Sequence, residues 1–151
     1  MYSEKATDSE EIKNVINNLC KDTVLELALN FGSDYRQKAF ETIENAHKFI
    51  IKLKETNEAV GLFGLIPITE HSAGIFLLTT DNLHKGNIVT FLKQARKQVN
   101  EWSNDYKLIM DYCYKQNKTI QKWLTLLGFK PSEHQDIDFQ IYYKGDISLY
   151  E

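Results

Sequence analysis

Two carboxylates, Glu26 and Asp111, are residues of this sequence that could carry out acid–base chemistry. Glu26 lies in an expected helix, and Asp111 lies on an expected strand that is otherwise rich in apolar residues. A carboxylate in apolar surroundings has a raised pKa and can act as a general base. Each residue also has a simpler structural explanation. Glu26 would be the partner in a helix capping box, and Asp111 a surface or hydrogen-bonded strand residue.

Tyr112 and Tyr114 lie on the same expected strand as Asp111, and each carries a phenol hydroxyl. They could donate protons, although two aromatic residues on a strand are also typical of packing. The four histidines are scattered without metal-ligand spacing, and there is no Ser-His-Asp triad or GxxxxGK[ST] loop. Cys20 and Cys113 form no CxxC pair and are expected to be thiols in a reducing compartment. We therefore expect no metal.

The composition is that of an ordinary globular protein. A chain of 151 residues predicts one domain, covering residues 1–151. The net charge of −3 gives no case for nucleic acid or a membrane surface as a partner. The N-terminus lacks an apolar signal core, and no window reaches the roughly 18 apolar residues of a membrane span. A cytoplasmic location is therefore expected.

The first part of the chain is predicted to be helical. Asp8 can cap a helix through SEEIKNVINNLC, where apolar residues recur at helical spacing. A second helix is expected to begin at Thr23, because Glu26 three residues later completes a capping-box pattern. Ser33 is expected to cap a third, shorter helix.

Strands follow from His47. The segments HKFIIKLKE, VGLFGLIPI and GIFLLTT have the composition and length of strands. The last two lack a polar face, so we expect both of their sides to be covered. Glycines 61 and 64 within them indicate a bulge or a close approach of backbone.

The longest helix is predicted from about Leu83 to Ser103. Its apolar stripe has i, i+3, i+4, i+7 spacing and consists of Ile88, Phe91, Leu92, Ala95, Val99 and Trp102. A strand in YKLIMDYCY, a helix in NKTIQKWLTLLGFKP and a last strand in DIDFQIYYKGD complete the chain. Two strands joined by a helix favour a parallel pair, so the class is α/β or α+β with a mixed sheet.

This order resembles the GNAT (Gcn5-related N-acetyltransferase) superfamily. Its members often carry an Asn at a strand-to-helix turn, and the helix then ends in Gly-Phe eleven and twelve residues later. Asn117, Gly128 and Phe129 have this spacing. The resemblance implies a mixed, mostly antiparallel central sheet with one parallel strand pair and helices on both faces. It also implies acetyl-CoA as a possible cofactor.

A narrower resemblance is to GNAT-like proteins of short-tailed phages, described as internal virion protein A or as acetyltransferase-like. It is carried by FLLTTDNL, FLKQARKQVNEW and YCYKQNKTIQKWLTLLGF, within residues 73–143. It implies a component of the virion or of particle assembly, located in the host cytoplasm or the virion. Phage structural proteins or host proteins would be its partners.

In the superfamily, the coenzyme A pyrophosphate binds at the N-terminus of the long helix, in a loop that reads Q/R-x-x-G-x-G/A. LHKGNI occupies that place, where Gly86 matches the middle glycine and Leu83 and Ile88 depart from the pattern. Alternatively, Gly86 simply eases a loop into a helix. The resemblance implies a coenzyme site formed by Leu78, Thr79, Thr80, His84, Lys85, Gly86, Asn87, Ile88 and Asn117.

The superfamily often uses a Tyr seven residues after the Asn to protonate the departing thiolate. Leu124 stands at that position, within an apolar stripe of core spacing. The candidate catalytic residues that remain are Glu26, Asp111, Tyr112 and Tyr114.

Three functions follow from these features. The first is a GNAT-fold phage protein of the particle with a degenerate acetyl-CoA site. The second is an active N-acetyltransferase that transfers acetyl from acetyl-CoA to an amine with a divergent loop. The third is a host-directed inhibitor that binds through an aromatic patch of Tyr142, Tyr143 and Tyr150.

Overall fold

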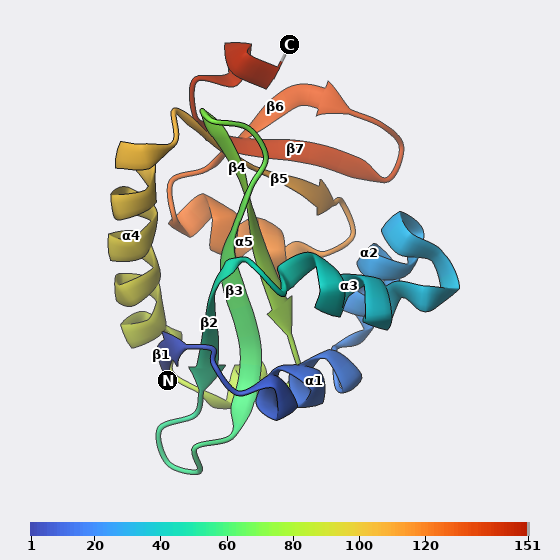
Figure 1. The fold of residues 1–151 in the computed structure, drawn as a ribbon, viewed down its shortest axis with the longest axis vertical. Coiled ribbons are helices and arrows are strands. Elements are labelled where there is room, and N and C mark those ends of the chain that lie inside the picture. The colour runs from blue at the N-terminus through green and yellow to red at the C-terminus, as the bar shows by residue number, and fades with distance from the viewer. Residues whose placement is uncertain (151) are drawn as a thin grey trace.

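The centre of the molecule is a seven-stranded sheet, seen in a computed structural model that describes residues 1–150 (Figure 1). Its spatial order is β1-β2-β3-β4-β5-β7-β6. All neighbours pair antiparallel except β4 and β5, which are parallel, so the predicted mixed sheet is confirmed. The strands are β1 (Tyr2–Lys5), β2 (His47–Lys52), β3 (Ala59–Pro67), β4 (Ser72–Thr79), β5 (Leu108–Tyr114), β6 (Lys130–Gln135) and β7 (Phe139–Gly145).

Helices cover both faces of the sheet (Figure 1). One face carries α1, α2 and α3, and the other carries α4 and α5. The helices are α1 (Ser9–Asn17), α2 (Lys21–Phe31), α3 (Tyr35–Ile43), α4 (Ile88–Asp105) and α5 (Lys118–Leu126), with single 3-10 turns at η1 (Gly32–Asp34), η2 (Asp81–Lys85) and η3 (Ile147–Tyr150).

Several helix starts differ from the prediction. Asp8 caps α1 as expected, since its Oδ1 accepts a hydrogen bond from the Glu10 N–H at 2.9 Å. Helix α2 begins two residues before Thr23, whose hydroxyl lies 3.2 Å from Cys20 Sγ, so the predicted capping box is wrong. Ser33 does not cap α3, because it lies inside η1. The long helix begins at Ile88, after a separate 3-10 turn.

The predicted apolar stripe of α4 is confirmed for five of its six residues, which are buried; Ile88 is the exception. Strands β3 and β4 are buried along most of their length, as their sequences predict. Gly64 is required by the close packing of β2 on β3. A Cβ atom there would lie 2.2 Å from the carbonyl oxygen of His47.

Strand β6 was not predicted. Its sequence, KPSEHQ, is polar and contains a proline, and all of its side chains are exposed or half-buried. It pairs only with β7, at the edge of the sheet, and the pairing is interrupted between Pro131 and Gln135. An edge strand tolerates proline because one side of its backbone needs no partner. Its residues do not alternate between apolar and polar, so the sequence pattern does not reveal the strand.

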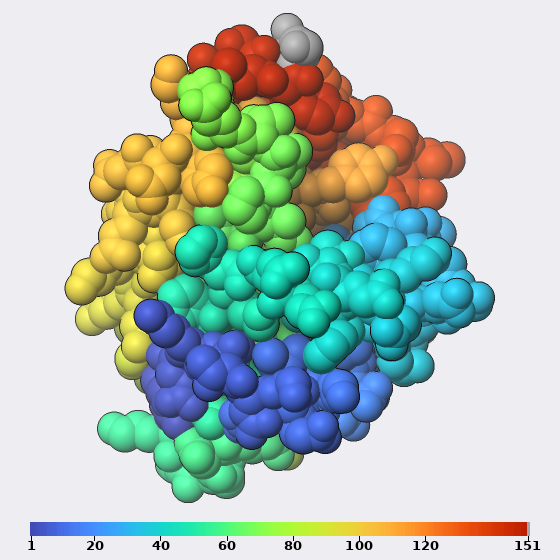
Figure 2. All heavy atoms as spheres, viewed as in Figure 1, coloured from blue at the N-terminus to red at the C-terminus, as the bar shows by residue number. Residues whose placement is uncertain are grey.

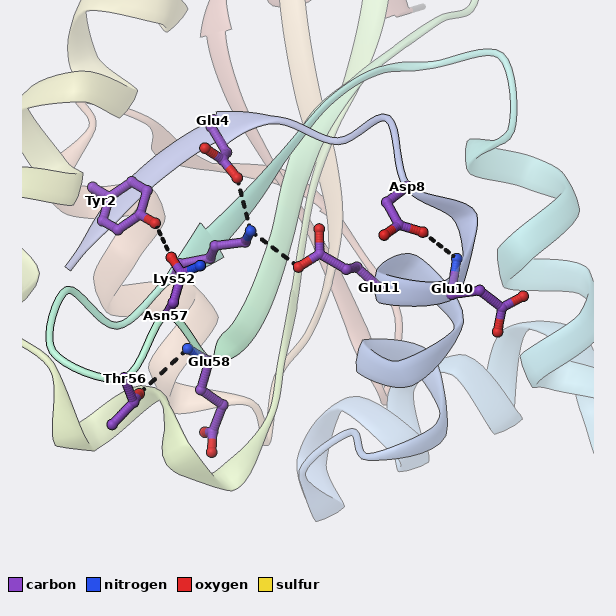
Figure 3. A network of polar contacts seen from close by, with 9 residues as sticks. All are labelled: Tyr2, Glu4, Asp8, Glu10, Glu11, Lys52, Thr56, Asn57 and Glu58. Atoms are coloured by element: carbon purple, nitrogen blue, oxygen red, sulfur yellow. Dashed lines mark hydrogen bonds and ion pairs between the residues drawn. The ribbon is translucent and has the colours of Figure 1, made fainter.

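A buried lysine ties the N-terminal segment to the sheet (Figure 3). Lys52 Nζ lies 2.8 Å from a carboxylate oxygen of Glu4 in β1 and 3.0 Å from one of Glu11 in α1. These two partners raise the pKa of Lys52 above its usual range. At the other end of β1, the Tyr2 hydroxyl donates to Asn57 Oδ1. The network fixes β1 and α1 against β2, beside the start of α4.

Among residues 1–150, no helix is both long and apolar enough to cross a membrane. The same residues contain no cluster of three or more His, Cys, Asp or Glu side chains that could hold a metal ion.

Candidate active site

The candidate site lies where strands β4 and β5 part (Figure 1). They pair only over Ser72–Gly74 and Leu108–Met110, at the start of both strands. Towards their carboxyl ends the two strands diverge and leave a gap in the sheet. A gap of this kind exposes backbone groups and admits side chains from both faces.

Backbone groups of β4 are partly occupied at the gap. Thr80 N–H donates to the Val60 carbonyl at 2.9 Å, so it faces β3. Because antiparallel backbone groups alternate in direction, the groups of Leu78 also face β3, and those of Leu77 and Thr79 face the gap. The Thr79 carbonyl already accepts from Cys20 N–H at 2.9 Å.

A cavity of about 650 Å³, the loop cavity, opens on one side of the gap. It is bounded by η2, the first turns of α2 and α4, and the outer face of α5. Two lysines and a histidine, Lys21, Lys122 and His84, lie in its wall together with two acidic residues, Asp22 and Asp81. The first N–H groups of α4 are close by, and a helix N-terminus favours an anion.

The loop that leads into α4 differs from a phosphate-binding loop made of small residues. Asn87 caps the helix, since its Oδ1 accepts from Val89 N–H at 3.0 Å. A Cβ on Gly86 would lie 2.8 Å from Met1 Sδ and 2.9 Å from Leu53 Cδ2, so close packing against these two side chains also favours glycine. Ile88 is 37% exposed, and its side chain lines the cavity where the superfamily pattern has a small residue.

The predicted coenzyme residues are divided by the structure. Five of them line the loop cavity, namely Thr79, Thr80, His84, Gly86 and Ile88. Leu78 lines the cavity on the other side of the gap. Lys85 and Asn87 belong to the loop but not to the cavity wall, and Asn117 is buried beneath α5. Lys21 and Lys122 were not predicted, because each comes from a helix distant in sequence.

A second cavity of about 580 Å³, the carboxylate cavity, lies between the sheet and helices α2 and α3. Glu26 and Asp111 are in its wall, which is otherwise largely apolar. Leu77 is the one described residue that lines both cavities, so they meet at the gap.

Glu26 spans the space between α2 and the end of β5. Its Oε1 accepts a hydrogen bond from Tyr114 N–H at 3.3 Å, and its Oε2 accepts one from Asn117 Nδ2 at 3.1 Å. Asn117 is 1% exposed and also caps α5, since its Oδ1 accepts from Ile120 N–H at 3.3 Å. Asn117 therefore orients Glu26 while it starts the helix.

The two carboxylates differ in their surroundings. Burial raises the pKa of Glu26, and its hydrogen bonds from Asn117 and Tyr114 oppose the rise. Burial raises the pKa of Asp111 well above its usual value, and the nearby charge of Glu26 adds to this. No hydrogen-bond donor within residues 1–150 contacts the Asp111 carboxylate. Burial thus favours the neutral form of both groups, and more strongly that of Asp111.

Replacing Asp111 with Asn is expected to stabilise the protein increasingly as the pH rises. An acid whose pKa is raised by folding stabilises the fold below its unfolded pKa of about 4, and this contribution is lost as the pH rises towards the folded pKa. Thermal unfolding of wild type and Asp111→Asn between pH 4.5 and 8 measures the difference. Asp105→Asn, at an exposed site of α4, controls for the charge removed. A difference that does not change with pH would contradict the assignment.

Of the two candidate catalytic tyrosines, Tyr112 lies in the wall of the carboxylate cavity and Tyr114 does not. Its hydroxyl donates to Asp136 Oδ2 at 2.5 Å, and this bond is the main reason that its pKa is raised. Tyr114 is half-buried and packs on Phe139, with ring centroids 5.7 Å apart. Leu124 is 0% exposed, as expected for the core residue that replaces the superfamily tyrosine.

The three tyrosines of the predicted aromatic patch do not form one surface. Tyr142 and Tyr143 are neighbours on β7, so their side chains point to opposite faces of the sheet. Tyr142 packs against the core beside α4 and α5. Tyr150 in η3 lines the carboxylate cavity instead.

No family model matches the chain, and no curated protein matches it in sequence. Solved structures match it in fold. The GNAT domain of S. lividans PAT has a TM-score of 0.69 at 10% identity, over 94% of this chain and 88% of that one.

Two further structures cover nearly all of both chains. The PaiA N-acetyltransferase from Thermoplasma acidophilum, in complex with coenzyme A, has a TM-score of 0.65 at 13% identity, over 97% of this chain and 100% of that one. The spermidine N-acetyltransferase from Vibrio cholerae, in complex with CoA and spermine, has a TM-score of 0.64 at 15% identity, over 94% and 93%. At these identities the likeness concerns the fold, and the fold of this chain is that of the GNAT acetyltransferases.

Proposed function

We propose that this protein is an N-acetyltransferase that uses acetyl-CoA and an amine. The observation that carries the proposal is that two cavities with different linings meet at Leu77, in the gap between β4 and β5. The loop cavity has two lysines, a histidine and a helix N-terminus, together with Asp22 and Asp81. The carboxylate cavity has two acidic groups. A phosphorylated donor and a cationic acceptor would thus approach the gap from different sides.

The loop cavity offers coenzyme A donors for its phosphates and a suitable size. Lys21, His84 and Lys122 would hold its phosphates with the first N–H groups of α4, and the backbone groups of Leu77 would face its pantetheine arm. A volume of about 650 Å³ lies within the usual range for cofactor sites. The coenzyme would supply an acetyl thioester. The T. acidophilum neighbour, solved with coenzyme A, supports this choice.

The carboxylate pair would manage the protons. An aliphatic amine is a cation at neutral pH, with a pKa near that of lysine, about 10.4, and it must lose a proton before it can attack a carbonyl carbon. Ionised Glu26 would take that proton, as a general base held in place by Asn117 and Tyr114. Protonated Asp111 would give its proton to the departing sulfur, the task for which Leu124 is unsuited.

Calorimetry with acetyl-CoA tests the proposal directly. We expect micromolar binding to the wild-type protein, together with release of free thiol when amines are added. No detectable binding at millimolar acetyl-CoA would contradict the proposal that the protein is an acetyltransferase. Gly86 is a poor site for a blocking substitution, because a side chain there would also displace Met1 and Leu53 from their packing.

Replacing Ile88 with Gly is expected to tighten acetyl-CoA binding about tenfold, the equivalent of roughly one added hydrogen bond. The physical reason is that Ile88 is the first residue of α4 and lines the cavity where the phosphates would contact backbone N–H groups. Val89→Gly is the matched control, since Val89 is 52% exposed and is not in the cavity wall. Equal affinities of the two variants would place the phosphates elsewhere.

A second candidate is a GNAT-fold component of phage particles that does not catalyse acetyl transfer. It rests on the sequence resemblance to short-tailed phage proteins. The burial of Leu124 and the position of the Ile88 side chain favour it over an enzyme of the usual pattern. The calorimetric experiment separates the two candidates.

A further inference from the structure

The wall of the carboxylate cavity indicates what kind of amine would fit. Most of its side chains are aliphatic or aromatic, and they come from the sheet as well as from α2 and α3. Those contributed by the strands include Ile66, Phe76, Met110 and Ile141, and Ile68 follows the end of β3. Such a surface binds an apolar body by removing both from water, at about 25 cal/mol per Å².

The charges of the wall are confined to one place. Among the described lining residues, Glu26 and Asp111 are the acidic ones, and none is a lysine, arginine or histidine. Both line the same wall, and Tyr114 N–H and Asn117 Nδ2 hold the Glu26 carboxylate in place. This carboxylate can pair with one ammonium group. A second ammonium on the same molecule would lie against apolar side chains, and the cost of removing it from water would weaken binding.

The cavity also limits the size of its occupant. Its volume of about 580 Å³ is in the range of sites for small molecules. In Figure 2 the surface is recessed between helix α3 and the orange-to-red C-terminal part of the chain, the segments that contribute to this wall. A small amine can therefore enter from solvent on this face.

We propose that the acceptor is a small primary amine with a single ammonium group on an apolar aryl or alkyl body, and not a polyamine or a lysine side chain of a protein. This substrate class rests on the proposed function. In the reaction, the amine nitrogen forms a bond to the acetyl carbon, and the bond from that carbon to sulfur breaks. The ammonium group gives one proton to Glu26 before the attack, and the sulfur takes a proton from Asp111 as it departs. The nitrogen loses its second proton as the amide forms, and that proton returns to Asp111.

The experiment compares phenethylamine, hexylamine, spermidine and a lysine peptide as acceptors, by thiol release and by calorimetry without acetyl-CoA. We expect the first two to bind and react, with a kcat/KM at least about tenfold above that of spermidine. That factor is the equivalent of burying roughly two methylene groups. A preference for spermidine or the peptide would overturn this inference and leave the acetyltransferase standing. Binding of phenethylamine without binding of acetyl-CoA would overturn the proposed function instead.

A matched pair of variants tests the cavity itself. Ile68→Glu adds a carboxylate to the wall at a residue that is 57% exposed, so folding is preserved. It is expected to reduce the preference for hexylamine over 1,6-diaminohexane by about tenfold, since one charge pair then favours the second ammonium. Ile137→Glu introduces the same charge at a residue that is 91% exposed and outside the cavity, and should leave the preference unchanged. An equal effect of both variants would show that the amine binds elsewhere.

Discussion

Glu26→Gln is expected to lower kcat/KM for acetyl transfer by about 10²- to 10³-fold, the usual contribution of a general base. The substitution removes the charge and the proton acceptor but keeps nearly the same shape. An amide oxygen can still accept the hydrogen bond from Tyr114 N–H, so the end of β5 stays in place. Acetyl transfer to phenethylamine at pH 7.5, with thermal unfolding as a check on folding, measures the effect.

Glu70→Gln is the control for loss of a negative charge. Glu70 lies in the exposed loop between β3 and β4, outside both cavities, and its replacement should leave the rate unchanged. If Glu26→Gln retains at least a third of the wild-type activity, Glu26 is not the base.

Asn117→Ala tests separately whether Asn117 positions Glu26. It would shift the pH profile of kcat as well as weaken the cap of α5, because Glu26 loses a hydrogen bond that lowers its pKa.

The largest loss of stability is expected for Trp123→Ala, at about 3–5 kcal/mol. Trp123 is 2% exposed and stacks on Phe91 with ring centroids 6.4 Å apart, while Phe63 meets it edge-on at 6.4 Å. Truncation would leave a cavity at the centre of these rings, between the sheet and both α4 and α5. Equilibrium unfolding in urea measures the change in the free energy of unfolding.

Trp123→Phe separates packing from hydrogen bonding. Within residues 1–150, the indole Nε1 is buried without a hydrogen-bond partner, so its removal costs no hydrogen bond. We expect this variant to lose less than half as much stability as the alanine variant. A loss below about 1 kcal/mol for Trp123→Ala would contradict the packing argument. Trp123 also lines the loop cavity, so the alanine variant should bind acetyl-CoA more weakly as well.

Local sequence patterns predicted the elements that carry a strong hydrophobic period. The stripe of α4 and the apolar runs of β3 and β4 are buried as expected, and the helix between β4 and β5 gives the expected parallel pair. In each case the pattern depends on neighbours within a few residues. Strand β6 was missed because its residues carry no such period, and only its pairing with β7 makes it a strand.

The prediction for Glu26 was wrong for another reason, a contact with a distant part of the chain. Its spacing from Thr23 predicts a capping box, but α2 begins earlier and the carboxylate contacts Asn117, which is 91 residues away. The local hydrogen bond and the distant one compete for the same oxygen atoms. The packing of α2 beside the end of β5 decides between them, and no pattern within the helix reports that packing.

By itself, the sequence determined the order of the helices and of the strands other than β6, the parallel pair and the loss of a tyrosine at Leu124, because each depends on residue type or on short-range periodicity. Only the tertiary structure decided where the site lies. Glu26 and Asp111 are each ambiguous in the sequence, and burial beside a gap in the sheet gives them their shared charge and their raised pKa values. The physical reason is that a carboxylate acquires its chemistry from desolvation and neighbouring charge, which arise from contacts between segments far apart in the chain.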